Sequence, residues 1–220
     1  KNETVVDKRR MATASAVKNQ LTLKGSTEIV AEFFHYSINS ILYQRGIYPP
    51  EDFVRESKYG LAMMVSKDEK LRDYLGKVLK DLEMWLLKGE IKQLVLVLSG
   101  VTSQVTLERW VFLVEHADDK ENGGNKQQVP SKSRKEISNE IAALLRQITA
   151  TVTFLPMLDD QCAFDILIYT DKETAVPIQW EESNPHLVEN AAEVRLRSFD
   201  TKIHKVEAAV AYREVDDDDV

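Results

Sequence analysis

Two apolar segments joined by a short polar turn constrain the fold of this chain most strongly. Residues 91–100, "IKQLVLVLSG", form a continuous apolar run of strand length. Residues 105–115, "VTLERWVFLVE", alternate between two faces, with Trp110, Phe112 and Val114 on the same one. We predict that these segments pair as an antiparallel hairpin at the centre of a sheet.

Three other stretches have the three-to-four residue apolar spacing of amphipathic helices. They begin at Ser26, Ser66 and Ser133, and the first two end near Gly46 and Gly89. The second and third open with a capping box, in which a serine is followed three residues later by a glutamate. We predict three helices, with Ser26 capping the first.

The third helix carries polar and aromatic residues on its outward side. Its apolar stripe lies within residues 137–152, and an advance of 100° per residue places Arg146 and Phe154 on the far side, with Gln147 at the edge. An aromatic side chain on the wet face of a helix indicates contact with a partner protein.

The C-terminal part of the chain predicts strands that follow an unusually long irregular segment. "CAFDILIY", from Cys162, is a strand, and "VRLRSFDTKIHKV" and "AAVAY" also have strand character. The residues between about 170 and 193 contain two prolines and little periodicity, which is often the mark of a functional segment. The charged stretch after His116 predicts a flexible loop, and "EVDDDDV" predicts a solvated tail.

Composition excludes several classes of function. The net charge of -7 and the isoelectric point near 5.3 disfavour nucleic acid and membrane surfaces as partners. No apolar run approaches the ~20 residues of a membrane-spanning helix. The single Cys162 excludes an internal disulfide and predicts a small buried side chain in a reducing compartment. Met11 is a candidate natural start, which would make residues 1–10 an extension irrelevant to the fold.

No sequence motif indicates catalysis. The glycines form no phosphate-binding loop, and the pair Asp159 and Asp160 predicts a solvated loop rather than acid–base chemistry. The histidines lack a second ligand at metal-site spacing, and we expect them to be surface or packing residues: His35, His116, His186 and His204. We therefore predict a protein that is not an enzyme and that binds no cofactor or metal.

A set of longer segments resembles one family over about residues 21–212, in order and with matching spacing. These are "GSTEIVAEFFHYSINSILYQRGIYP", "KYGL", "LERWVF", "RQITATVTFLP", "FDILIYTDKE", "WEES", "EVRLRSF" and "IHKV…VAY". The chain thereby resembles the HORMA-domain spindle-assembly-checkpoint proteins, the mitotic-arrest-deficient-two family. It departs from animal members in the loop after His116, the N-terminal extension and the acidic tail. Ala191 and Ala208 stand where some members carry regulatory serines, so the resemblance does not extend phosphorylation control to this chain.

The resemblance implies an α+β HORMA fold, in which three helices pack on a central antiparallel sheet. It divides the chain into a flexible extension (1–20), a single HORMA domain (21–212) and an acidic tail (213–220). Within the domain, a core of about 21–170 carries a mobile C-terminal segment of about 171–212, called the safety belt. In the open form the belt covers the edge strand that begins at Cys162, and in the closed form it crosses to the other side of the sheet.

The resemblance also implies a function, partners and a location. The implied protein switches between open and closed forms, binds a coiled-coil kinetochore checkpoint protein, and sequesters the activator of the anaphase-promoting complex to delay anaphase. Further implied partners are other components of the mitotic checkpoint complex, a HORMA-like silencing adaptor with an AAA+ remodelling ATPase, and a second copy of the chain. The implied locations are the nucleus, nuclear envelope, kinetochore and cytoplasm. Alternatives are a translesion-polymerase subunit, a meiotic axis protein, or a regulatory subunit of an enzyme.

The site residues follow from matching positions. The resemblance implies a dimerisation and partner surface formed by Arg146, Gln147, Phe154 and Trp85. It implies a peptide-binding edge strand with Phe164, Ile166, Ile168 and Tyr169. It assigns to the safety belt the residues Trp180, Ile203, His204, Val206 and Tyr212.

Overall fold

The computed structural model describes residues 21–117 and 132–214 of the 220-residue chain. The predicted N-terminal extension, most of the charged loop and all but the beginning of the acidic tail lie outside these ranges. The elements, in chain order, are α1 (Leu23–Gln44), η1 (Pro50–Asp52), β1 (Phe53–Lys58), β2 (Leu61–Ser66), α2 (Glu69–Lys88), β3 (Ile91–Gly100), β4 (Thr106–His116), α3 (Arg134–Ala150), η3 (Thr151–Thr153), β5 (Cys162–Thr170), β6 (Ala191–Asp200) and β7 (His204–Arg213).

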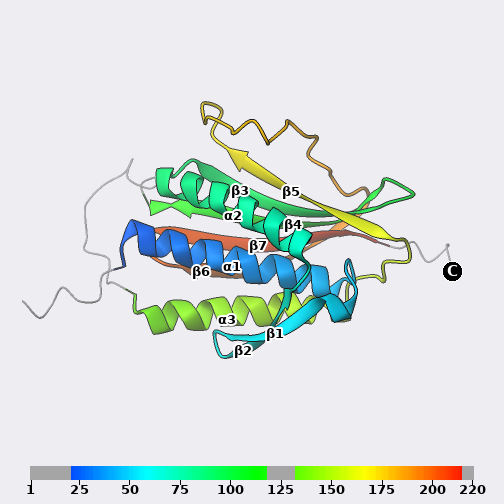
Figure 1. Ribbon diagram of the computed structural model, residues 1–220, viewed down its shortest axis with the longest axis horizontal. Helices are drawn as coiled ribbons and strands as arrows, with labels where there is room; N and C mark the ends of the chain where they lie inside the picture. The colour runs from blue at the N-terminus through cyan, green and yellow to red at the C-terminus, as the bar shows by residue number, and fades with distance from the viewer. Residues whose placement is uncertain (1–20, 118–131, 215–220) are drawn as a thin grey trace, which may run out of the picture.

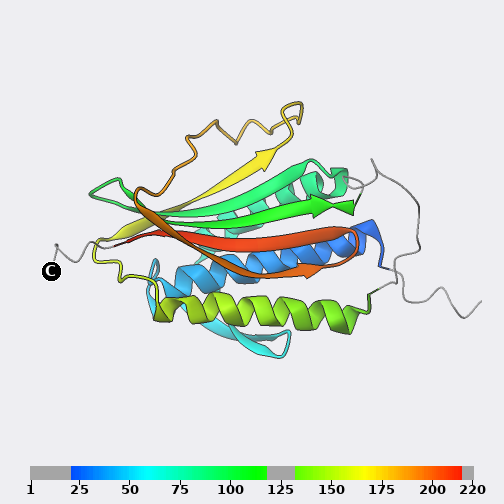
Figure 2. The ribbon, with the colours of Figure 1, turned by 180° about the vertical axis from the view of Figure 1, so that it is seen from behind.

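The molecule has two layers, one of helices and one formed by a five-stranded antiparallel sheet. Its strand order is β5-β3-β4-β7-β6, so the predicted hairpin of β3 and β4 lies at its centre. The helices α1, α2 and α3 lie on one face of this sheet (Figure 1), and within the described residues the other face carries no helix (Figure 2). The predicted α+β architecture, with three helices on a central antiparallel sheet, is confirmed.

The core lies between α1 and the middle of the sheet. Trp110 and Phe112 of β4 share a face, as the alternation in the sequence predicts, and the structure shows that this face points into the core, with both side chains at most 1% exposed. Phe33 of α1 packs edge-on against Phe112 and against Phe199 of β6, with ring centroids 5.8 and 4.8 Å apart. A strand of the predicted safety belt therefore contributes directly to the main core.

Three helix ends differ from the prediction. Asp68, rather than Ser66, caps α2, because its carboxylate accepts the Leu71 N–H at 2.8 Å, and Ser66 ends β2. Thr22, rather than Ser26, caps α1, because its hydroxyl accepts a hydrogen bond from the Gly25 N–H at 3.1 Å. Helix α3 begins with the predicted capping box but ends at Ala150, and a short 3-10 turn follows it. Phe154 comes after that turn, so its orientation does not follow from helical periodicity.

A two-stranded hairpin, β1 and β2, lies apart from the main sheet in the stretch between α1 and α2. Its turn places Tyr59 and Gly60 at φ values of 52° and 70°, as hairpin turns of two residues require. The Tyr59 hydroxyl donates to Glu32 of α1 at 2.5 Å, which ties the hairpin to the helix.

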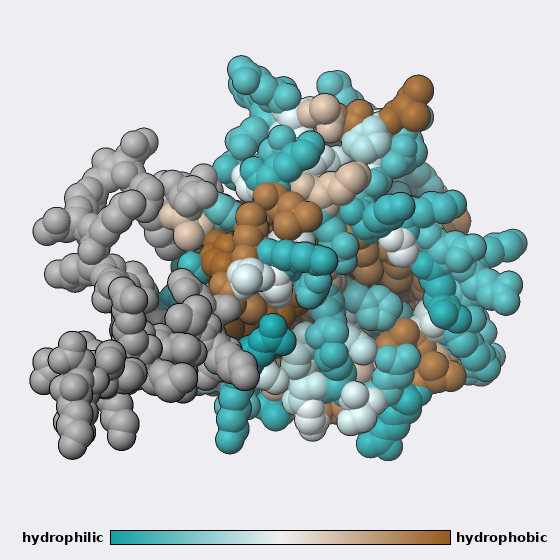
Figure 3. Space-filling model, turned by 60° about the vertical axis from the view of Figure 1, so that its left-hand side comes forward, coloured by the Kyte–Doolittle hydropathy of each residue, from teal (hydrophilic) through white to brown (hydrophobic). Residues whose placement is uncertain are grey.

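The surface at the end where α1 and α3 begin is largely hydrophilic. Figure 3 brings this end forward and shows one group of apolar side chains near the middle of the face and smaller groups toward its right side, among mostly hydrophilic residues. Exposed apolar residues near this end include Leu23 at the start of α1 and Leu87 at the end of α2. Within the described ranges, no helix combines the length and apolarity that crossing a membrane requires.

Candidate functional site

Strand β5 has an unoccupied edge. Within the described sheet its neighbour is β3, while β7 pairs with β4 and β6 pairs with β7 on the opposite side. Figure 2 shows the chain leaving β5, crossing the sheet near one end and returning as β6 and β7. This is the arrangement that the resemblance assigns to the closed form.

The predicted edge residues divide between the two faces of β5. Phe164 and Ile168 are half-buried and Ile166 is buried, and all three pack with the helix-side core. The Phe164 ring lies 5.9 Å from the ring of Tyr74 on α2. Tyr169 lies on the opposite face of β5, and its hydroxyl accepts a hydrogen bond from the Arg109 guanidinium at 3.2 Å.

Residues 171–190, which we call the belt linker, contain no helix or strand but are attached to α2. The Trp180 indole N–H donates to the Asp81 carboxylate at 2.9 Å, and the Gln179 amide donates to the same oxygen at 2.9 Å. The indole ring of Trp180 also packs edge-on against Trp85, with centroids 5.4 Å apart. Asp81 is only 8% exposed, so two hydrogen bonds from the belt linker help to compensate its burial.

The belt linker is also held to the other face of the sheet. The Arg109 guanidinium of β4 donates to the Pro185 carbonyl at 3.2 Å and lies over the Tyr169 ring at 6.0 Å from its centroid. The two attachments, at Trp180 and at Pro185, make the linker pass around the free edge of β5.

A groove of about 590 Å³ lies between the belt linker, α2 and β5. The linker contributes polar and aromatic groups to it, and β5 contributes part of its free edge. Acidic groups in its lining can receive a basic side chain, and Val78 and Ile166 supply apolar surface. The full lining is Tyr74, Lys77, Val78, Asp81, Asp165, Ile166, Leu167, Gln179, Trp180, Glu181, Ser183 and His186. An extended peptide of matching chemistry could add to the edge of β5 here.

The structure leaves two of the four residues predicted for the dimerisation and partner surface exposed. Arg146 is exposed, and Phe154 is 48% exposed with its ring 6.4 Å from that of Tyr212. Gln147 is partly used within the chain, because its side-chain oxygen accepts the Arg197 N–H of β6 at 2.7 Å. Trp85 is 3% exposed and packs against the belt linker, so it does not contribute to an exposed surface in this arrangement.

The residues predicted for the safety belt anchor it at several points. Val206 and His204 are buried, and Ile203 and Tyr212 are half-buried. Trp180 anchors the belt linker, as described above. The sequence did not single out the two residues that hold the belt linker, Asp81 of α2 and Arg109 of β4. Their partners, Trp180 and the Pro185 carbonyl, lie 99 and 76 residues away in the sequence.

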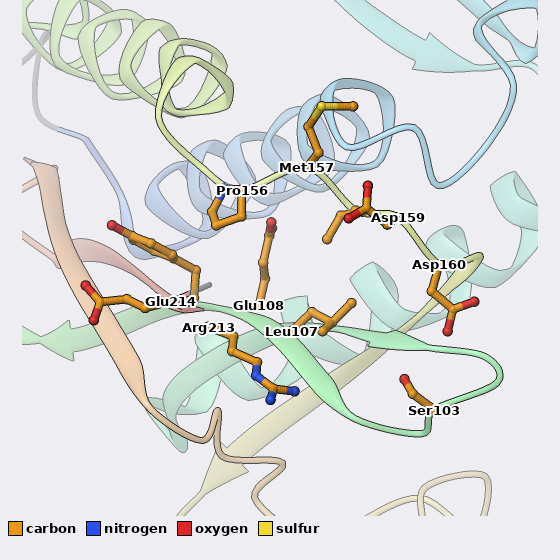
Figure 4. A pocket seen from close by; sticks show the side chains of 11 residues that line it. Ser103, Leu107, Glu108, Pro156, Met157, Asp159, Asp160, Arg213 and Glu214 are labelled. Atoms are coloured by element: carbon orange, nitrogen blue, oxygen red, sulfur yellow. The ribbon is translucent and has the colours of Figure 1, made fainter. Parts of the chain in front are cut away.

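A second cavity, of about 330 Å³, lies where the α3–β5 connection meets β4 and the end of β7. In Figure 4 the Glu108 side chain projects into it, while Asp159 and Asp160 lie along the connection. Glu108 is 1% exposed and forms an ion pair with Arg45 at 2.5 Å, and the Trp110 indole donates to its other oxygen at 3.0 Å. Burial raises the pKa of Glu108, although Arg45 opposes that shift. The floor of the cavity is therefore a Glu108 carboxylate paired with the Arg45 guanidinium, not an unpaired carboxylate.

Cys162 departs from the sequence-based expectation, whereas His204 is a packing residue, as the sequence predicts. Cys162 is half-buried rather than buried, and burial raises the pKa of its thiol. His116 and His204 are not isolated, since β4–β7 pairing brings their rings to 5.1 Å. Within residues 21–117 and 132–214, no three His, Cys, Asp or Glu side chains gather as a metal site would require.

Comparison with known proteins assigns the chain to a family. The HORMA domain model matches residues 26–204. The Mitotic spindle assembly checkpoint protein MAD2A of Dictyostelium discoideum is 55% identical over 203 residues, covering 92% of this chain and 98% of the relative. The human protein of the same name is 51% identical over 203 residues, with the same coverages.

A solved structure agrees with this assignment. A chain in the crystal structure titled Mitotic Checkpoint Complex is 46% identical, with a TM-score of 0.78, covering 86% of this chain and 99% of that one.

The alternative of a polymerase subunit is more distant. The DNA polymerase zeta processivity subunit of Schizosaccharomyces pombe is 24% identical over 163 residues, which is 73% of this chain. The chain belongs to the HORMA-domain family, and within it to the mitotic spindle assembly checkpoint proteins.

Proposed function

We propose that this checkpoint protein captures an extended peptide on the edge of β5 and retains it beneath the belt linker. One observation carries the proposal: β5 has a free edge that faces the groove, while the belt linker passes around that edge and is fixed to α2 through Trp180. Strand addition would satisfy the open main-chain groups of β5, and the groove would select the peptide's side chains.

The chemistry of the groove defines the ligand. Alternate side chains of an added strand would face the apolar residues Phe164 and Ile166, which favours an apolar cluster. Asp165 and Glu181 favour a basic residue beside that cluster. A proline a few residues further on would end the strand pairing.

We further propose that residues of about 171–212 move as a safety belt relative to a core of about residues 21–170. In the alternative arrangement, β7 would leave β4 and the belt would cover β5 instead, which would exclude the peptide. The pairing of β7 with β4 comprises nine residue pairs, so moving the belt requires a local unfolding step rather than an ordinary loop motion. A peptide that binds one arrangement alone would shift the population toward it.

Self-association would use the exposed surface around Arg146 and Phe154. Gln147 borders this surface and also bonds to β6, so the surface would differ between the two arrangements of the belt. One copy with its belt as observed could then recognise a second copy whose belt lies elsewhere.

In the cell, the ligand peptides would come from a coiled-coil kinetochore checkpoint protein and from the activator of the anaphase-promoting complex. Sequestering that activator within a mitotic checkpoint complex would delay anaphase. A HORMA-like silencing adaptor and an AAA+ ATPase would reverse the capture, at kinetochores, the nuclear envelope, the nucleus and the cytoplasm. The role is that of a binding protein without catalysis.

Fluorescence anisotropy with a labelled peptide tests the proposal. The peptide contains a basic residue, an apolar cluster and a downstream proline, and a scrambled peptide of the same composition is the control. We expect the ordered peptide to bind and the scrambled one not to bind. Equal affinity for both peptides would contradict recognition by strand addition in this groove.

A further inference from the structure

A buried hydrogen-bonded cluster joins the start of α1 to the turn between β6 and β7. The Ser26 hydroxyl lies 2.7 Å from the Thr201 hydroxyl and 2.7 Å from Nδ1 of His204. Nε2 of His204 lies 3.3 Å from the Leu86 carbonyl at the end of α2. Ser26, Thr201 and His204 are 0, 2 and 1% exposed. The cluster therefore ties one turn of the belt to two core helices.

The chemistry of its members fixes the direction of the hydrogen bonds. A carbonyl oxygen only accepts, so the proton of a neutral imidazole resides on Nε2, which faces Leu86. Nδ1 is then an acceptor, and the Ser26 hydroxyl donates to it. The Thr201 oxygen receives the main-chain N–H groups of Ile203 and His204 at 3.2 and 2.8 Å, which shapes the turn.

The distance between Ser26 and His204 is that of a nucleophile and its base, but the burial excludes that role. Ser26 is completely inaccessible, so no substrate could reach its hydroxyl without removal of the belt. The hydroxyl is also not used for capping, because Thr22 caps α1. Its hydrogen bonds hold two parts of the molecule together.

We propose that Ser26, Thr201 and His204 are a latch that is specific for the observed position of the belt. Thr201 and His204 belong to the segment that pairs with β4, whereas Ser26 and Leu86 belong to the core helices. A β7 strand paired with β5 would lie beyond β5, at the opposite edge of the sheet from its observed position, so His204 could not reach Ser26. The latch thus stabilises one arrangement alone.

This inference rests on the proposed movement of the belt, but its test needs no ligand. Ser26→Ala removes the hydroxyl that bonds to both belt residues, and Thr201→Val removes the partner hydroxyl with little change of shape. Ser37→Ala is the matched control: Ser37 is also in α1 and 0% exposed, and its hydroxyl has no hydrogen-bond partner among the described residues.

Amide hydrogen exchange of the full chain measures the effect separately in β7 and β3. We expect Ser26→Ala and Thr201→Val each to lower the protection factors of β7 by about ten-fold or more. Ser26→Ala leaves the buried Nδ1 of His204 without its donor. Thr201→Val leaves the main-chain N–H groups of Ile203 and His204 without their acceptor. Ser37→Ala should leave β7 unchanged.

Two outcomes would overturn the latch. One is β7 protection in Ser26→Ala equal to that in Ser37→Ala, whatever happens to β3. The other is equal protection of β3 and β7 in the wild-type protein together with an equal loss of protection in both strands of Ser26→Ala. The cluster would then stabilise the whole core rather than the position of the belt. Failure of peptide capture at β5 would appear in the anisotropy experiment and would leave both readouts unaffected.

Discussion

Lowering the pH from 7.5 to 5.0 should weaken docking of the belt through His204. Burial lowers the pKa of His204 from 6.5 to about 4 in the observed arrangement, and the neighbouring His116 adds to the shift. A belt released from β4 would expose the imidazole and restore a pKa near 6.5. The released state therefore binds more protons, so docking is strongest above pH 6.5 and weakens as the pH falls toward 4.

The size of the effect follows from these two pKa values. At pH 5.0 the imidazole would be about 97% protonated in the released state and about 10% protonated in the docked state. The ratio of the two binding polynomials then favours release by about 30-fold relative to pH 7.5, or about 2 kcal/mol.

The groups that face His204 are a hydroxyl, a carbonyl and a second imidazole. The Ser26 hydroxyl from α1 and the Leu86 carbonyl from α2 do not ionise in this range, which leaves His116 of β4 as the titratable neighbour. At the same turn, hydrogen bonds from Lys202 outweigh burial and lower the pKa of Asp200 below 3.8, outside the interval.

Protection factors of β7 amides are the appropriate assay, since they correct for the intrinsic pH dependence of exchange. Wild-type protein is compared at pH 7.5, 6.5, 5.5 and 5.0 with His204→Gln, whose side chain does not titrate. We expect the wild-type β7 protection to fall by about 30-fold and the variant to lack this component. An identical pH dependence in both proteins would refute the linkage to His204.

Four further perturbations have definite expected outcomes. Trp180→Ala should speed peptide dissociation by about 30-fold or more, since it removes a hydrogen bond to Asp81 and an aromatic contact worth about 2 kcal/mol or more together; stopped-flow fluorescence measures this, with the fully exposed Ile178→Ala as the unaffected control. Arg146→Ala should weaken self-association in sedimentation at several concentrations and change the free energy of unfolding by no more than about 0.5 kcal/mol; an unchanged dimer fraction would count against this surface. Arg45→Ala should cost about 3–5 kcal/mol in denaturant unfolding, because Glu108 would stay buried without its partner, and Glu108→Gln in the same chain should recover part of the loss. Fresh and aged protein should separate into two slowly exchanging peaks on anion exchange, and a single peak under all conditions, with or without peptide, would argue against two arrangements.

Short-range sequence patterns predicted the strands, helix starts and irregular segments that depend on neighbouring residues alone. Alternation in β4 placed Trp110 and Phe112 on the same face, and the capping box at Ser133 located the start of α3, because each of these signals is contained within a few neighbouring residues. The irregular linker followed by strands was also visible, since prolines and missing periodicity interrupt an otherwise regular pattern.

The remaining features depend on contacts between distant residues. Asp81 receives Trp180 from 99 positions away, and Ser26 receives His204 from 178 positions away, so neither role leaves a local pattern. Ser26 instead resembled a helix cap, because serine is a common capping residue and α1 begins nearby. The choice of β4 rather than β5 as the partner of β7 is likewise invisible locally, since both strands offer an apolar face and open main-chain groups.

Amide exchange of β5 with and without the peptide tests the central claim most directly. In an added strand, the β5 amides that point away from β3 would donate to the peptide, whereas those that point toward β3 already have partners. The account predicts that saturating peptide strongly protects the outward amides between Cys162 and Thr170, with little change in the alternate ones. Tight binding of the peptide with no change in exchange at the outward β5 amides would contradict it.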